Sequence, residues 1–567
     1  MKQLSGTDNL FLQLEHGNQY MHVAGLGIYD PSTAPGGAVR FKDILQFFEA
    51  RLDRAPVFHR RLVTVPLDLD RPYWIDDGHI DVEFHVRHIA LPQPGDWRQL
   101  CIQVARLHSR PLDRSKPLWE VYVIEGLDNI DGLPPGSFAL YTKFHHAAVD
   151  GEGGTELMKA IHSFSPEEGH EQPDRPPRFQ DREPTALELG ARTVIHTAQK
   201  GPKLARLTFK AASQLAGLGA DYVSQLSNMF EQAGVPSVKV SRPKTKKPPV
   251  TRFSGQVSAH RVVELVGISM ADIKMVRQRL EGTTFNEVFL ATVAGSLRKY
   301  LDAKGELPER SMTAQVPMTT RGRDKGGDVG NQIAIGVMPL HTEIEDPIER
   351  LRTISKGSEK AKSTMARVGK DFAANVFDLL PAAASELVTK RMMLPTMNMV
   401  VSNVRGPDIP MYMAGARLVN FAPVSVAMDG LGLNVTGFSY HGTMWICATA
   451  CREMMPDPGF YAQCLRESFD ELVAAVAGLP EPSKRSAASR GKAKRAKAKR
   501  RPQPKVKAKT RTKAKAKTKA KSRKAKTVRG KVAGAGPATR KKAAAKASRT
   551  SRTKAKTRRR AKAKKNA

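Results

Sequence analysis

The stretch FALYTKFHHAAVDGEGGTELMKAIHSF, residues 138–164, joins a strand pattern to a helix pattern through a polar turn. Apolar residues alternate up to the adjacent histidines His145 and His146, which predicts a strand over 138–146. Successive side chains of a strand point to opposite faces. The two imidazoles are therefore expected to have different roles, one in chemistry and one in packing.

The turn after the histidines contains Asp150 and Gly151. An aspartate at such a position can hold backbone groups or a basic side chain, and a glycine permits a close approach that a β-carbon would forbid. An alternative interpretation is that both histidines are hydrogen-bonded core residues and that Asp-Gly is an ordinary turn signal. The spacing alone leaves both interpretations open.

Strand-like and helix-like segments alternate on both sides of this stretch. Examples are FKDILQFFEARL (41–52), HRVVELVGI (260–268) and FNEVFLATVAGSLRKYL (285–301). A chain of 567 residues exceeds what one core usually covers, so two mixed α/β domains are expected. The predicted units are an N-terminal domain over 1–182, a helical crossover and linker over 183–250, a C-terminal domain over 251–480 and a basic tail over 481–567.

The formal net charge of +37 comes from the C-terminal tail. Ser483–Ala567 holds 38 Lys and Arg and no Asp or Glu, which leaves 54 basic and 55 acidic residues in the rest of the chain. The tail has no aromatic residue and a low-complexity Lys/Ala composition, so it is expected to be disordered. The body by itself does not have the charge of a nucleic-acid-binding protein.

The four cysteines are too few and too scattered for a disulfide framework, and this fits a reducing compartment. Cys447 and Cys451 could bind a metal in principle, but their spacing differs from C-x-x-C and there is no second pair, so no metal is assigned. The N-terminal segment does not resemble a secretory signal, and no apolar run reaches 18 residues. We therefore expect a cytoplasmic protein that meets lipids from the surface.

The pattern His145-His146-x-x-x-Asp150-Gly151 resembles the HHxxxDG signature of the CoA-dependent acyltransferase superfamily. More narrowly, the chain resembles the bacterial wax ester synthase/diacylglycerol acyltransferase family over about residues 4–475. The resemblance is carried by segments in the family's order: LSGTDNLFL, MHVAGLGIYD, FHRRLV, FHVRHIALP, LHSRPLDRSKPLWEVYVIEGL, FNEVFLATVAG, VGNQIAIGVMPL and VSNVRGP. The basic tail lies outside it.

This resemblance implies two chloramphenicol-acetyltransferase-like domains and an acyl-CoA-dependent O-acyltransferase. The acceptor is expected to be diacylglycerol, giving triacylglycerol, or a long-chain alcohol, giving a wax ester. His146 is then the general base, His145 a supporting residue, Asp150 a structural residue and Gly151 a turn residue beside the channel. Acyl-CoA is a co-substrate, and no further cofactor is implied.

Four further residues are weaker candidates for substrate binding. Leu118 and Trp119 could line an acyl channel or simply pack in a core. Asn286 could bond near the site or cap the helix that follows, and it precedes Glu287 where the family commonly has aspartate. Arg405 could contact a CoA phosphate or brace the interface between the domains.

Two other functions stay open on the sequence alone. One is a different HHxxxDG acyltransferase, which takes its acyl group from a carrier protein or forms an amide. The other is a nucleic-acid-binding protein that acts through its basic tail. For the acyltransferase, the tail is expected to hold the enzyme peripherally on an anionic membrane or lipid-droplet surface, with non-specific DNA binding as a side activity.

Overall fold

The computed structural model describes residues 1–149, 153–168, 180–196, 198–199, 247–319, 333–368, 378, 385–386 and 389–479. Asp150, Gly151, the tail over 481–567 and most of the predicted crossover lie outside these residues. Among the described helices, none combines the length and apolar character that a membrane crossing requires. The four cysteines are buried and free.

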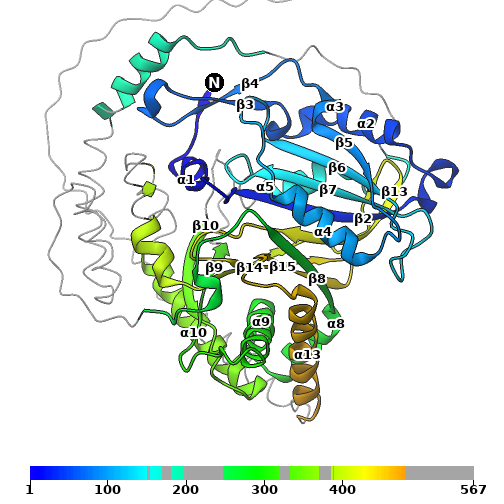
Figure 1. Cartoon of the computed structure of the whole chain (residues 1–567), viewed down its shortest axis with the longest axis vertical. Coiled ribbons are helices and arrows are strands. Elements are labelled where there is room, and N and C mark those ends of the chain that lie inside the picture. Colours follow the sequence, from blue (N-terminus) through cyan, green and yellow to red (C-terminus); the bar gives the residue numbers. More distant parts are fainter. Residues whose placement is uncertain are drawn as a thin grey trace, which may run out of the picture. The chain divides into compact units, whose positions relative to one another are not determined.

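The first sheet has six strands in the order β12-β13-β2-β7-β6-β5, and only β5 and β6 are parallel (Figure 1). Its strands are β2 (His22–Asp30), β5 (Val86–Ala90), β6 (Trp119–Glu125), β7 (Phe138–His145), β12 (Tyr412–Met413) and β13 (Ala416–Val424). A small sheet of β1 (Lys2–Gln3), β4 (Tyr73–Asp76) and β3 (Arg60–Val63) accompanies it. The helices of this half are α1 (Gly6–Leu14), α2 (Phe41–Glu49), α3 (Val82–His85), α4 (Trp97–His108) and α5 (Gly153–Ala160).

The second sheet has six strands in the order β10-β9-β11-β14-β15-β8, with β11 parallel to both of its neighbours. Its strands are β8 (Arg261–Ser269), β9 (Thr313–Thr319), β10 (Ile333–Pro339), β11 (Met399–Arg405), β14 (Leu433–Tyr440) and β15 (Thr443–Cys451). Figure 1 shows its helices gathered on one face: α8 (Met270–Arg279), α9 (Phe285–Asp302), α10 (Pro347–Val368) and α13 (Pro458–Ala477). The expectation of two mixed-sheet halves with flanking helices is confirmed.

The second half contributes two strands, β12 and β13, to the first sheet. β13, which belongs to the second half by sequence, pairs antiparallel with β2 from Arg417↔Asp30 to Val424↔Ala24. The predicted boundary at residue 251 follows the order of the chain and therefore places β13 in the second domain. In the structure, β13 pairs with β2 of the first sheet. Sequence patterns report local structure and carry no information on which distant strand a segment joins.

A shared apolar core also joins the halves. Helix α4 begins at a capping box in which Asp96 and Gln99 satisfy each other's backbone N–H groups. Its buried face contributes Leu100 and Val104 to a cluster that also contains Tyr141 of β7 and Leu265 of β8. The helix is therefore covered by the first sheet on one side and by strand β8 of the second half on another.

Gly406 follows β11 in the segment VSNVRGP, and we expect a substitution there to lower the stability of the protein. A β-carbon there would overlap the Phe438 ring and the backbone carbonyl of Ser439, which accepts a hydrogen bond from Gly406 N–H at 3.0 Å. We expect Gly406→Ala to lower the free energy of unfolding by about 1–3 kcal/mol in urea denaturation. The control is Gly357→Ala in α10, which has open space and should be neutral or stabilising by up to about 1 kcal/mol. Equal stability of the two variants would contradict the packing described.

Candidate active site

Strand β7 ends at His145, one residue earlier than predicted, and residues 146–148 turn away from the sheet. Leu140 and Phe144 pack on one face of the strand, while Tyr141 packs on the other. The alternation predicted from the sequence is therefore confirmed. The neighbouring strands hold the end of β7, because His146 N–H donates to Met21 O at 2.7 Å and His145 N–H donates to Leu118 O at 3.1 Å.

His146 stands in the turn with its ring stacked on Phe11 of α1, the centroids 3.8 Å apart and the planes 15° from parallel. The residue as a whole is partly exposed, but Nδ1 is buried and has no hydrogen-bond partner among the described residues. Burial lowers the pKa of His146 to about 4, and the nearby His145 acts in the same direction. The imidazole is therefore neutral near pH 7.

His145 is buried and has a defined tautomer. Its Nδ1 accepts a hydrogen bond from Ala147 N–H at 3.0 Å, so the ring proton lies on Nε2. Nε2 donates to Glu15 Oε2 at 2.7 Å. The first histidine of the pair is thus fixed in its own turn on one side and bonded to Glu15, which follows the N-terminal helix, on the other.

Glu15 was not among the residues singled out from the sequence. Arg114 also donates to Glu15 Oε2 at 2.7 Å, and His22 Nε2 lies 3.5 Å from Oε1, longer than a hydrogen bond. Burial acts to raise the pKa of Glu15, but His145, His22 and Arg114 together outweigh it and hold that pKa well below its ordinary value. Glu15 contacts His145 across 130 positions of sequence, and no local pattern marks it.

A buried polar layer continues behind His145. His22 faces His145 edge-on at 5.9 Å, and burial lowers its pKa to about 4, so it too is neutral. Lys143, two residues before His145 on the same face, forms an ion pair with Glu120 at 2.9 Å. Its Nζ also donates to the carbonyls of Leu107 and Arg110 at the end of α4, at 3.3 and 3.2 Å. Helix α4 is therefore bonded directly to the strand that carries the histidines.

Leu118 and Trp119 are both fully buried, with different neighbours. Leu118 belongs to an apolar cluster that contains Ala147 of the turn and has Phe11 packed against it. Trp119 stacks on His85 at 4.2 Å and donates from Nε1 to the Phe58 carbonyl at 3.1 Å. The described contacts of Trp119 are those of a core residue, whereas Leu118 lies beside the histidine turn.

Asn286 is not the helix cap that the sequence suggested as its alternative role. Thr284 is the N-cap of α9 and forms a capping box with Glu287, so Asn286 is the second residue of the helix. Asn403 Nδ2 of β11 lies 3.5 Å from Asn286 Oδ1. The pattern Thr-x-x-Glu could have identified the cap from the sequence.

Arg405 points to solvent, with 83% of its side chain exposed, and pairs with Asp408 at 3.0 Å. Within the part of the chain that the structure describes, neither Arg405 nor Asn286 bonds to the histidine pair. The placement of Asp150 and Gly151 lies outside the described residues, and their predicted roles stay predictions.

Comparisons with known proteins agree along most of the chain. The model of the wax ester synthase/diacylglycerol acyltransferase catalytic domain matches residues 4–289, and the model of the WS/DGAT C-terminal domain matches residues 329–473. A Mycobacterium tuberculosis protein named as a diacylglycerol O-acyltransferase is 33% identical over 485 residues, 84% of this chain and 100% of the relative. The solved wax ester synthase/diacylglycerol acyltransferase of Marinobacter aquaeolei VT8 is 30% identical, covers 84% of this chain and 100% of its own, and has a TM-score of 0.59.

We expect the substitution of Glu15, the buried carboxylate, to lower the stability of the protein. Glu15→Gln removes the charge that receives His145 and Arg114, and we expect the free energy of unfolding to fall by about 1–3 kcal/mol near pH 7. Because the folded state lowers the pKa of Glu15, its contribution is present above its ordinary value of 4.5 and is lost as the pH falls through the folded value. The gap between wild type and variant should therefore shrink below about pH 4.5 in urea titrations.

Glu359→Gln is the matched control for this experiment, because Glu359 is exposed on α10 and has no ion-pair partner among the described residues. It should leave the free energy of unfolding unchanged. A Glu15→Gln protein as stable as this control at pH 7 would contradict the role assigned to Glu15.

Proposed function

Because the chain belongs to the wax ester synthase/diacylglycerol acyltransferase family, it is an acyl-CoA-dependent acyltransferase, and we propose that it esterifies diacylglycerol or a long-chain alcohol with His146 as general base. The observation that carries the proposal is the state of His146. It is neutral, partly exposed and held by its stack on Phe11 at the end of a strand. A general base must be unprotonated and accessible to the hydroxyl group that it deprotonates.

The reaction needs no nucleophile from the enzyme. As the acceptor hydroxyl attacks the thioester carbonyl carbon, His146 takes its proton and a tetrahedral oxyanion forms. The oxyanion collapses, the carbon–sulfur bond breaks and the imidazolium returns the proton to the departing CoA sulfur. The products are an ester and free CoA, and His146 is neutral again.

The lowered pKa of His146 has two consequences for this role. The base form is present throughout the physiological pH range, because the pKa of about 4 lies well below it. Formation of the imidazolium is unfavourable in the resting site, so the negative charge that develops on the substrate oxygen must offset it.

One assay can show whether the enzyme esterifies a diacylglycerol, a long-chain alcohol or both. Purified protein is incubated with labelled palmitoyl-CoA and either hexadecanol or a diacylglycerol, and the esters are resolved by thin-layer chromatography. Labelled wax ester or triacylglycerol supports the proposal and ranks the acceptors. Hydrolysis of palmitoyl-CoA without ester formation from either alcohol would overturn it.

We expect replacement of His146, the proposed general base, to cause a large loss of acyltransferase activity. We expect His146→Ala to lower kcat/KM for palmitoyl-CoA by about 100-fold or more, with an unchanged circular dichroism spectrum. His79→Ala, at an exposed histidine, is the control and should keep wild-type activity. Because the pKa of His146 is about 4, the wild-type kcat/KM should be level between pH 6 and 8. Near wild-type turnover by His146→Ala would leave the histidine pair with a packing role only.

We also propose that the basic tail holds the enzyme on the anionic lipid surface where its hydrophobic product accumulates. Ser483–Ala567 carries 38 positive charges and no negative charge, and each basic residue near such a surface contributes on the order of 1 kcal/mol. Binding to DNA through the same charges is expected to be non-specific, since the tail has no aromatic residue to stack on bases.

Truncation after Pro482 tests the tail. Turnover on detergent-solubilised substrate should stay nearly unchanged, while binding to vesicles that contain phosphatidylglycerol should weaken. For the full-length protein this binding should fall as salt is raised, because screening acts on exposed charges. Equal vesicle binding by both proteins at low salt would refute the surface attachment, and loss of solution activity would show that the tail belongs to the catalytic fold.

A further inference from the structure

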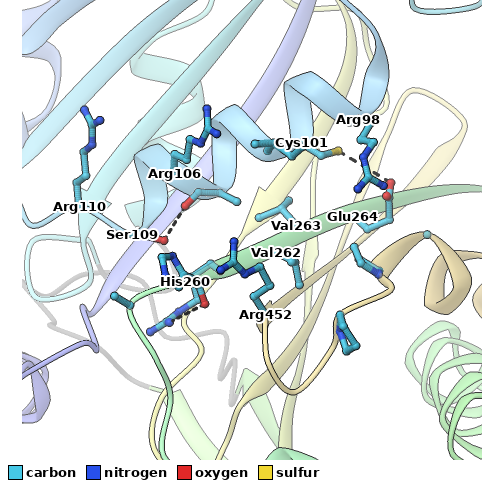
Figure 2. A pocket seen from close by; sticks show the side chains of 17 residues that line it. Arg98, Cys101, Arg106, Ser109, Arg110, His260, Val262, Val263, Glu264 and Arg452 are labelled. Carbon is cyan, nitrogen blue, oxygen red and sulfur yellow. Dashed lines mark hydrogen bonds between the residues drawn. The ribbon is translucent and has the colours of Figure 1, made fainter. Parts of the chain in front are cut away.

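A cleft of about 650 Å³ lies between α4 and β8, on the side of the fold where the two halves share their core. Five arginines line it, and we call it the arginine cleft. Four of them are exposed: Arg98, Arg106 and Arg110 come from the α4 segment, and Arg452 follows β15. The fifth, Arg261, is buried. Figure 2 shows the α4 residues along one wall and Arg452 on the opposite wall beside His260. The cleft is thus built from both halves of the chain.

The charge of the arginine cleft is not neutralised by the protein. None of the four exposed arginines forms an ion pair with a described carboxylate. The single carboxylate of the lining, Glu264, already accepts a hydrogen bond from Trp97 Nε1 at 2.7 Å. Elsewhere, partly buried arginines have carboxylate partners, as in the pairs Arg60–Asp76 and Arg252–Glu306.

The arginines of this wall lie close together along the chain. Arg98, Ile102 and Arg106 follow one another at intervals of four on one face of α4, and Arg110 lies two residues beyond the end of that helix. Because none of these guanidinium groups forms an ion pair with a described carboxylate, an anion in the cleft can pair with them. Arginine is also the side chain best suited to phosphate, because its guanidinium donates two parallel hydrogen bonds.

The floor of the cleft is rigid. Arg261 is buried, and its guanidinium donates to the carbonyls of Ser258, His260, Asn18 and Ala427, which joins segments from both halves. Ile102, Val262 and Pro458 supply an apolar part of the lining. A ligand with phosphate groups and a flat apolar ring would match both kinds of surface.

The arginine cleft is connected to the histidine strand. The carbonyl of Arg110 accepts from Lys143 Nζ at 3.2 Å, and Lys143 lies two residues before His145 on β7. Arg405, the residue that the sequence offered for a CoA phosphate, is already paired with Asp408. We propose that the arginine cleft binds the phosphate groups of the nucleotide end of acyl-CoA, an inference that rests on the proposed function.

A comparison of two acyl donors can distinguish binding of the CoA phosphates by the arginine cleft from a general effect of the substitutions on catalysis. Palmitoyl-CoA carries the nucleotide, whereas S-palmitoyl-N-acetylcysteamine presents the same thioester without any phosphate. For the double variant Arg106→Gln/Arg452→Gln, which takes one charge from each wall, we expect the KM for palmitoyl-CoA to rise about tenfold or more with little change in kcat. Kinetics with the phosphate-free donor should match the wild type, and lysine at both positions should restore part of the affinity.

The matched control is Arg352→Gln/Arg466→Gln, two exposed arginines outside the cleft that likewise lack a described carboxylate partner. It should leave the KM values for both donors unchanged. Adenosine 3′,5′-bisphosphate should bind to the wild type in calorimetry and compete with palmitoyl-CoA, and the Arg106→Gln/Arg452→Gln variant should lose this binding. Binding to phosphatidylglycerol vesicles should be the same for wild type and variant.

Each other outcome overturns the inference. An unchanged KM, or equal losses with both donors, would show that the arginine cleft does not bind the nucleotide. Reduced vesicle binding with intact nucleotide binding would assign the cleft to a lipid headgroup. Failure of the wild type to acylate any alcohol from either donor would defeat the proposed function instead, while calorimetry with adenosine 3′,5′-bisphosphate would still decide whether the cleft binds the nucleotide.

Discussion

The hydrogen bond from His145 Nε2 to Glu15 is the interaction on which the arrangement of the site depends. Phe11 and Glu15 are four residues apart at the end of α1, so one helix supplies both the ring that stacks on His146 and the carboxylate that receives His145. Adjacent side chains of a strand cannot share a face. A single helix across the strand end can nevertheless fix both, because β7 stops at His145 and the chain turns there.

The same contact gives the two histidines different surroundings. His145 is held on both ring nitrogens, which leaves it no free position for a substrate. His146 has a stacked ring, an unpartnered Nδ1 and partial exposure. The interpretation of a buried histidine with both ring nitrogens bonded therefore fits His145, and the catalytic role of His146 stays a prediction.

Features that depend on neighbouring residues could be predicted from the sequence. The alternation over 138–145, the turn and the helix after it follow from local periodicity, and the Thr284–Glu287 cap could have been recognised in the same way. The role of Glu15 could not be predicted from the sequence. Its carboxylate contacts His145 only when the pairing of β2 with β7 brings these distant segments together. Arg98, Arg106 and Arg110 were not singled out from the sequence, and the opposite wall at Arg452 comes from tertiary structure.

The pairing of β13 with β2 has a consequence for synthesis of the chain. β2 is complete by Asp30, but its partner β13 does not emerge until residues 416–424 have been translated. At about 5–20 residues per second, one edge of an apolar strand waits roughly 20–80 s for its partner. An unpaired edge of that kind can pair with another nascent chain. The first half therefore cannot mature as an independent unit on the ribosome, and its productive folding is coupled to completion of nearly the whole catalytic body.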